Sequence, residues 1–216
     1  DMGFAAIAQS IAAFESGVAV SSFSSKYDAV LSDQAELTAR EQQGLELFNG
    51  KARCARCHDS GPTGPGQDLA FSDFGYHNIG VPPNPDNPFY RMDRLTIDGK
   101  AVNAQGAAWT DPGLAGFLLQ LASDGAWRGA PHVTAAVKSL TSEQLTRLAD
   151  ENLGKHRVPT LRNVDLRPSP DFTKAYAHNG YFKTLRGLVH FLNTRDVLPR
   201  CATAMTEAEA LASDCW

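Results

Sequence analysis

The chain has 216 residues, of which 20 are Lys or Arg and 24 are Asp or Glu, giving a formal net charge of −4. This length suits one large or two small domains with a sizeable hydrophobic core. The mild charge and the lack of a Lys/Arg cluster give no support for nucleic-acid binding, and no apolar run approaches the length that crosses a bilayer. The sequence begins at Asp1 without a signal peptide, which is typical of a mature, processed or trimmed polypeptide.

The first two helices are predicted from apolar spacing and from a capping pattern. Ile7 and Ile11 belong to an apolar set at helical spacing, which predicts a helix over residues 4–15. A serine-rich linker follows over residues 21–25. The next helix should begin at Thr38, in a capping box with Glu41, and it should end at Asn49-Gly50.

A Cys-x-x-Cys-His run follows this helix directly, at residues 54–58. It is the attachment pattern of c-type haem. Cys54 and Cys57 can each add to a haem vinyl group as a thioether, and His58 can ligate the iron from the same turn. The alternatives are a chance match, a redox pair or a zinc pair. However, no βαβ context surrounds the run, and the other two cysteines lie far downstream. We therefore expect one covalent haem c with His58 as the proximal iron ligand.

Residues 61–90 are rich in Gly, Pro, Asn and Asp and should form an irregular loop. The loop carries Phe71, Phe74, Tyr76 and His77. These rings are well placed to cover a porphyrin, although ordinary packing within the loop explains them equally well.

The rest of the chain is predicted to form short helices separated by extended segments. Their expected first or capping residues are Asp111, Thr141, Asp171, Thr184 and Thr206. The helix from Asp171 should end at Asn179-Gly180, and the proline-broken segment 157–170 should be extended. Because strand signals are scarce, the predicted fold class is mainly α with long irregular loops.

Cys201 and Cys215 enclose 13 residues near the end of the chain. This spacing is compatible with a disulfide that would stabilise the fold by about 3 kcal/mol, and two free thiols are the alternative. A covalent haem together with a disulfide favours an oxidising compartment, and we expect the periplasm.

Several stretches resemble the bacterial di-haem cytochrome c peroxidases and their MauG-like relatives. They occur in family order over almost the whole chain: IAAFE (11–15), LELFNGKARCARCH (45–58), GYHNIGVP (75–82), VPTLRNV (158–164) and AYAHNGYFKTLRGLVHFLNTRDV (175–197). Only the C-terminal haem domain of the family is matched. The resemblance therefore implies a c-type cytochrome domain with helices like those of class I cytochromes c.

The resemblance also implies a domain organisation and a role. Residues 1–20 look like the helix that joins the family's two halves, and residues 21–216 look like a mono-haem cytochrome c domain. In the family, the N-terminal haem meets peroxide, whereas the C-terminal haem receives and relays electrons. We therefore expect an electron-transfer domain whose redox partner is a second haem domain or chain. If the chain is catalytic itself, it is expected to be a haem peroxidase.

The second axial ligand of the iron does not follow from the resemblance. Relatives place a Met or a Tyr at the position of Leu192, and leucine cannot coordinate iron. His190 should point to the opposite face of that helix. The remaining candidates are Met92, Met205, His77, His178, His132 and His156. An open or water-occupied position is a further alternative.

Three other functions remain open at this stage. The chain could be a stand-alone mono-haem electron carrier or ligand-binding cytochrome without catalysis. It could instead oxidise residues of a partner protein, as in the MauG-like branch, or serve as a docking subunit that retains haem as a core filler. The spectrum of the bound haem and the presence of a companion haem chain would separate these hypotheses.

Overall fold

The computed structural model describes residues 2–17, 20, 23–61, 69–129, 133–166, 169, 171–172 and 174–216. The described residues are mainly helical, which confirms the predicted fold class. They divide into two compact units, Asp1–Asp73 and Phe74–Trp216. The functional division into residues 1–20 and 21–216 stays a prediction.

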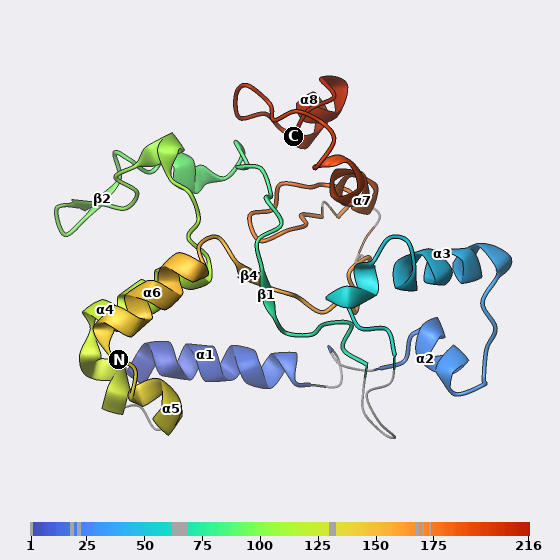
Figure 1. Ribbon diagram of the computed structural model, residues 1–216, viewed down its shortest axis with the longest axis horizontal. Helices are drawn as coiled ribbons and strands as arrows, with labels where there is room; N and C mark the ends of the chain where they lie inside the picture. The colour runs from blue at the N-terminus through green and yellow to red at the C-terminus, as the bar shows by residue number, and fades with distance from the viewer. Residues whose placement is uncertain are drawn as a thin grey trace. The chain divides into compact units, whose positions relative to one another are not determined.

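The described residues of the first unit form three α-helices and one short 3-10 turn (Figure 1): α1 (Met2–Glu15), α2 (Lys26–Leu31), α3 (Ala39–Asn49) and η1 (Cys54–Arg56). Helix α1 is confirmed, and its apolar Ile7, Ile11 and Phe14 are exposed. Helix α2 was not predicted. It begins after Ser25, which forms a capping box with Asp28 where only a linker was expected.

Helix α3 begins and ends as predicted. The side chain of Thr38 accepts a hydrogen bond from the backbone N of Glu41, and the Glu41 carboxylate accepts one from the backbone N of Thr38 at 2.7 Å. Lys26, at the start of α2, places its Nζ 2.5 Å from Oε2 of the same carboxylate. Glu41 therefore joins the first turns of α2 and α3.

The part of the second unit that the structure describes contains the remaining helices and two small antiparallel strand pairs. Its elements are β1 (Tyr76–His77), η2 (Pro88–Arg91), β2 (Thr96–Ile97), β3 (Lys100–Ala101), η3 (Gly106–Ala108), α4 (Leu114–Ser123), η4 (Gly125–Gly129), α5 (Ala135–Lys138), α6 (Ser142–Glu151), β4 (His156–Arg157), α7 (Leu185–Thr194) and α8 (Glu207–Ala212). Strand β1 pairs with β4, and β2 pairs with β3. Helices α4 and α6 lie side by side (Figure 1).

The predicted N-cap at Asp111 is wrong, because α4 begins at Leu114. Gly113 precedes it with φ of 55°, a backbone conformation that favours glycine and that helical residues do not adopt. The backbone N of Leu114 donates instead to the carbonyl of Lys155 at 2.8 Å, and Oδ1 of Asp111 accepts from Gly113 N. A glycine is needed here, because a Cβ would clash with the Lys155 backbone.

The helix predicted from Asp171 to Asn179 is also wrong: the described residues of this segment contain none. Tyr176 pairs with Phe182 in an isolated β-bridge, in which its backbone N donates to the Phe182 carbonyl at 2.8 Å. Asn179 and Gly180, with φ of 68° at the glycine, form the turn between them. Pairing across this turn satisfies backbone groups that a helix would otherwise satisfy.

The helices predicted at Thr141, Thr184 and Thr206 are confirmed as α6, α7 and α8. The main core lies around α7 and α8, where Phe182, Phe191 and Trp216 are buried in contact with one another. The predicted disulfide between Cys201 and Cys215 is present. Among the described residues, no helix has both the length and the apolar character to cross a membrane.

Candidate functional site

The Cys-x-x-Cys-His run forms one closed turn after α3. The carbonyl oxygen of Cys54 accepts from the backbone N of Cys57 at 3.2 Å and from that of His58 at 2.9 Å. Arg53, with φ of 58°, turns the chain out of the helical direction just before the motif. Because the three predicted haem-binding side chains share a single turn, they can reach one porphyrin from one side.

Both cysteines of the turn are free thiols and are half-buried. Burial raises the pKa of the Cys54 thiol above its ordinary value. Burial also raises the pKa of Cys57, and the nearby Asp73 carboxylate raises it further.

A backbone carbonyl orients the imidazole of His58. Its Nδ1 lies 2.8 Å from the carbonyl oxygen of Phe71, which leaves Nε2 as the nitrogen that can ligate a metal. Ligating histidines commonly hydrogen-bond through their other nitrogen, which fixes the ring and its tautomer. Two residues further on, the backbone N of Asp73 donates to the carbonyl of Cys57 at 2.8 Å. Segment 71–73 therefore holds the motif at two points.

Sequence reasoning missed this role of Phe71 and treated the residue only as an aromatic surface. A backbone acceptor leaves no mark in residue type, so only the fold reveals it. Phe71 adopts φ of 50°, an uncommon left-handed conformation for a large side chain. Such a conformation persists where the surrounding contacts hold it.

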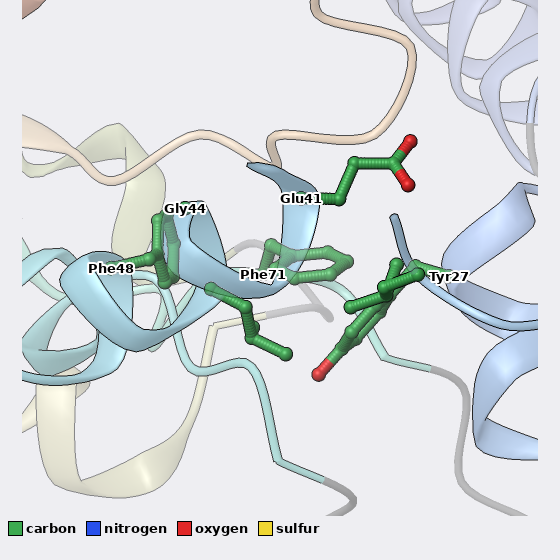
Figure 2. Close-up of a pocket in the computed structure, with 7 residues that line it drawn as sticks. Tyr27, Glu41, Gly44, Phe48 and Phe71 are labelled. Atoms are coloured by element: carbon green, nitrogen blue, oxygen red, sulfur yellow. The ribbon is translucent and has the colours of Figure 1, made fainter. Parts of the chain in front are cut away.

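Those contacts come from α2 and α3, next to a pocket of about 210 Å³ (Figure 2). The ring of Phe71 lies between Phe48 and Tyr27, with centroid distances of 6.5 and 5.7 Å. The Tyr27 hydroxyl donates to the carbonyl of Ser60 at 3.2 Å, just beyond the motif. The lining residues are Tyr27, Leu37, Glu41, Gly44, Leu45, Phe48 and Phe71. The wall of the pocket therefore extends directly to the residue that orients His58.

The candidates for the second axial ligand all belong to the second unit, apart from His132, which lies outside the described residues. Met205 packs against the core around α7 and α8. Met92 is half-buried at the end of η2, and His77 is exposed on β1. None of these placements selects a ligand, so the identity of the second axial ligand stays a prediction.

His178 and His156 are paired with each other. Their rings stack with centroids 3.6 Å apart and an interplanar angle of 11°. Nε2 of His178 also lies 3.9 Å from Oδ2 of Asp111. These three side chains form a cluster of potential ligands within the second unit.

Leu192, which stands where the resemblance to the di-haem peroxidases predicts a ligand, is 45% exposed on α7. Val189, one turn earlier on the same helix, is 62% exposed, so the two residues form an apolar surface on α7. His190 lies instead beside Trp216, with ring centroids 5.7 Å apart. These positions agree with the expectation that His190 and Leu192 point in different directions.

Comparison with known proteins identifies the relatives of this chain. No protein-family model matches it. Methylamine utilization protein MauG from Paracoccus denitrificans is 28% identical over 193 residues, 89% of this chain and 38% of that protein. Cytochrome-c peroxidase IdrP1 from Denitromonas iodatirespirans is 30% identical over 173 residues, 74% of this chain and 33% of that protein. Cytochrome-c peroxidase IdrP2 from Pseudomonas sp. (strain SCT) is 27% identical over 166 residues, 77% of this chain and 34% of that protein. The chain is a distant homologue of these proteins.

The homology to MauG and the cytochrome-c peroxidases confirms the resemblance seen in the sequence. The chain spans roughly a third of the length of the curated relatives it matches. It therefore corresponds to a part of MauG and of the cytochrome-c peroxidases.

Proposed function

We propose that this chain is a c-type haem domain that relays electrons within a peroxidase-type oxidoreductase. The observation that carries the proposal is the turn of residues 54–58, which presents two free thiols and one oriented imidazole together. The donor set fits haem c, because two cysteines and one histidine at this spacing are its attachment pattern. Homology to MauG and to cytochrome-c peroxidases supports the same conclusion.

Each residue of the turn has a separate task in this proposal. Cys54 and Cys57 anchor the porphyrin through thioether bonds, and His58 ligates the iron through Nε2. The carbonyl of Phe71 accepts the Nδ1 proton of His58, which raises the basicity of the imidazole and keeps its orientation. When bound, haem supplies one-electron redox chemistry at its iron.

The proposed partner is a second haem domain or chain at which peroxide reacts, and this chain delivers electrons to it. We place the reaction in the periplasm, because the disulfide between Cys201 and Cys215 favours an oxidising compartment. Peroxide cleavage needs an acid–base group within hydrogen-bond reach of the bound oxygens. The proposal assigns electron relay to this chain and peroxide chemistry, with its acid–base group, to the partner, as the resemblance to the di-haem peroxidases implies.

Two measurements on the native protein test this proposal. The chain would be isolated from its source organism together with associated proteins, and the covalent haems would be counted per chain and per assembly. We expect one haem on this chain and at least one on a companion domain or chain, with peroxide turnover only in the assembly. A native protein with a single haem and no companion haem protein would overturn the relay role. It would favour the stand-alone electron carrier or ligand-binding cytochrome.

Visible spectra of the isolated haem-loaded chain would identify the second axial ligand. A thioether-to-iron charge-transfer band in the oxidised protein would indicate Met92 or Met205. A high-spin spectrum that changes on addition of cyanide would indicate an open or water-occupied position. A low-spin spectrum without the thioether band would indicate a histidine, and Asn substitutions at His77, His132, His156 and His178 would identify which one.

A further inference from the structure

Three side chains from separate segments of the second unit converge at one place: Asp111, His156 and His178. One potential ligand atom from each residue lies within 4.8 Å of the others. Two imidazoles and one carboxylate are the donor types that bind zinc and related divalent transition metals. We propose that these residues form a divalent transition-metal site, distinct from the haem-binding turn.

The separation of the donor atoms fits a shared ion. Nε2 of His178 and Oδ2 of Asp111 lie 3.9 Å apart, which is longer than a hydrogen bond. Zinc binds nitrogen and carboxylate oxygen at about 2.0–2.2 Å, so two ligands of one ion lie at most about 4 Å apart. The rings of His156 and His178 are stacked face to face, and one ligand atom of each lies within 4.8 Å of the other. A turn of the more exposed His178 ring would complete coordination.

Backbone contacts hold two of the three residues in place. Segment 111–114 lies against 154–156, because Gly154 N donates to the Pro112 carbonyl at 2.9 Å and Leu114 N donates to the Lys155 carbonyl at 2.8 Å. Asp111 uses Oδ1 to accept from Gly113 N at 2.8 Å, which leaves Oδ2 directed toward His178. His156 continues from this contact into β4, opposite His77 of β1.

His178 is fixed by the turn that follows it. The side chain of Asn179 donates to the Pro82 carbonyl at 2.8 Å, and Asn84, which is buried, donates to the Asn179 carbonyl at 2.9 Å. His178 also borders an open hollow of about 400 Å³, lined by residues that include Asp86 and Lys183. This hollow provides the entry path that a metal site requires.

The charges around the cluster are compatible with a cation. Lys155, the basic residue next to His156 in the sequence, donates from its Nζ to Oδ1 of Asn152 at 3.2 Å. Burial and the neighbouring His156 lower the pKa of His178, whereas Asp111 raises it. Placing His178 in this site also removes it from the candidates for the second axial ligand of the haem.

Equilibrium dialysis of the haem-loaded chain against micromolar zinc, with metal analysis, tests the proposal. We expect one zinc per chain, bound at least about tenfold more weakly in Asp111→Asn, His156→Asn and His178→Asn, since even outer-shell changes cost about that factor. Asp111→Asn keeps the oxygen that accepts from Gly113, so this variant should fold. His190→Asn is the matched control and should bind zinc like the wild type. Iron content and the haem spectrum should be unchanged in all four variants.

A second measurement needs no variant. In the wild type, zinc should protect His156 and His178 from diethyl pyrocarbonate, as mapped by mass spectrometry, while His190 stays reactive. Wild-type protein that binds no zinc, or variants that bind it as tightly as the wild type, would overturn the proposal. Equal modification of His156 and His178 with and without zinc would also overturn it. None of these outcomes bears on the haem-relay role, which is tested by counting haems.

Discussion

The carbonyl oxygen of Phe71 accepts a hydrogen bond from Nδ1 of His58 at 2.8 Å, so a backbone group 13 residues downstream orients the proposed iron ligand. The ring of Phe71 packs in turn against Tyr27 and Phe48. The orientation of His58 therefore depends on how α2 and α3 pack around Phe71.

The first prediction concerns Phe48, which is half-buried against Phe71. Phe48→Ala should destabilise the haem-loaded protein by about 2 kcal/mol, roughly half the usual cost for a fully buried phenylalanine. Guanidinium unfolding measures this loss of stability when it is followed at the Soret absorption band of the haem bound at His58. Leu47→Ala is the matched control: Leu47 is 54% exposed on the same helix, and its loss should cost under about 0.5 kcal/mol. Equal effects of the two variants would contradict the packing role of Phe48.

The second prediction concerns the pH dependence of stability at Glu41. Hydrogen bonds from Lys26 and Thr38 lower the pKa of this carboxyl to about 2. Because the folded pKa lies below the unfolded one, the charged carboxylate contributes stability above about pH 4.5. That contribution is lost as the pH falls toward 2. Glu41→Gln keeps a capping acceptor but removes the charge, so its stability should fall below that of the wild type only at higher pH.

Lys26→Met provides the matching test of this ion pair, since Lys26 Nζ lies 2.5 Å from Oε2 of Glu41. It should weaken the same pH-dependent contribution, and adding it to Glu41→Gln should change that contribution little further. Urea unfolding between pH 2 and pH 7 measures both effects. Fully additive losses would show that the two side chains act independently.

The third prediction compares two glycines in helices. Gly187, inside α7, lies so close to the Glu207 carboxylate that an added Cβ would clash with it. Glu207 is buried and accepts from the backbone N of Lys183 at 2.6 Å. Gly187→Ala should therefore destabilise the fold by about 1–3 kcal/mol through overpacking.

Gly44 is the control for this prediction, because a Cβ there would meet nothing within 4 Å. Gly44→Ala should stabilise α3 by about 0.5–1 kcal/mol, since alanine loses less backbone entropy on folding. If thermal unfolding shows a lower stability for Gly187→Ala and a higher stability for Gly44→Ala, the contact with Glu207 decides the outcome at Gly187. A stabilising Gly187→Ala would show that Glu207 can move aside at little cost.

The fourth prediction concerns the disulfide that closes the C-terminal segment. Cys201 N donates to the Trp216 carbonyl at 2.8 Å, and Trp216 Nε1 donates to Oγ1 of Thr194 on α7 at 2.8 Å. Replacing both Cys201 and Cys215 by Ser should cost about 3 kcal/mol, because the unfolded chain regains the freedom of the closed loop. Thermal unfolding should separate the variant from the wild type in oxidising buffer, and the difference should vanish with a reductant.

Local patterns in the sequence were enough to predict much of this chain. The capping boxes at Thr38 and Thr141 positioned their helices correctly, because a cap and its partner lie three residues apart. The turn of residues 54–58 was likewise identifiable, since its three donors are encoded within five positions. The disulfide was predicted from spacing alone and is present.

Other features depended on contacts between distant residues, which no local pattern contains. The helix expected at Asp111 begins later because Gly113 and Leu114 contact Lys155, and the helix expected after Asp171 is replaced by the bridge between Tyr176 and Phe182. A helix cap competes with such tertiary hydrogen bonds, and only the folded chain shows which of them forms.

The Cys-x-x-Cys-His turn also has some features that local sequence determines and others that depend on contacts between distant residues. By itself, the sequence determined which side chains we propose for haem attachment, because their identity and spacing are local. Only the tertiary structure decided how His58 is oriented, since its partner is a backbone carbonyl held by Phe48 and Tyr27. It likewise brought Asp111, His156 and His178 together from segments far apart in the chain. Backbone acceptors and long-range convergence leave no signature in residue order.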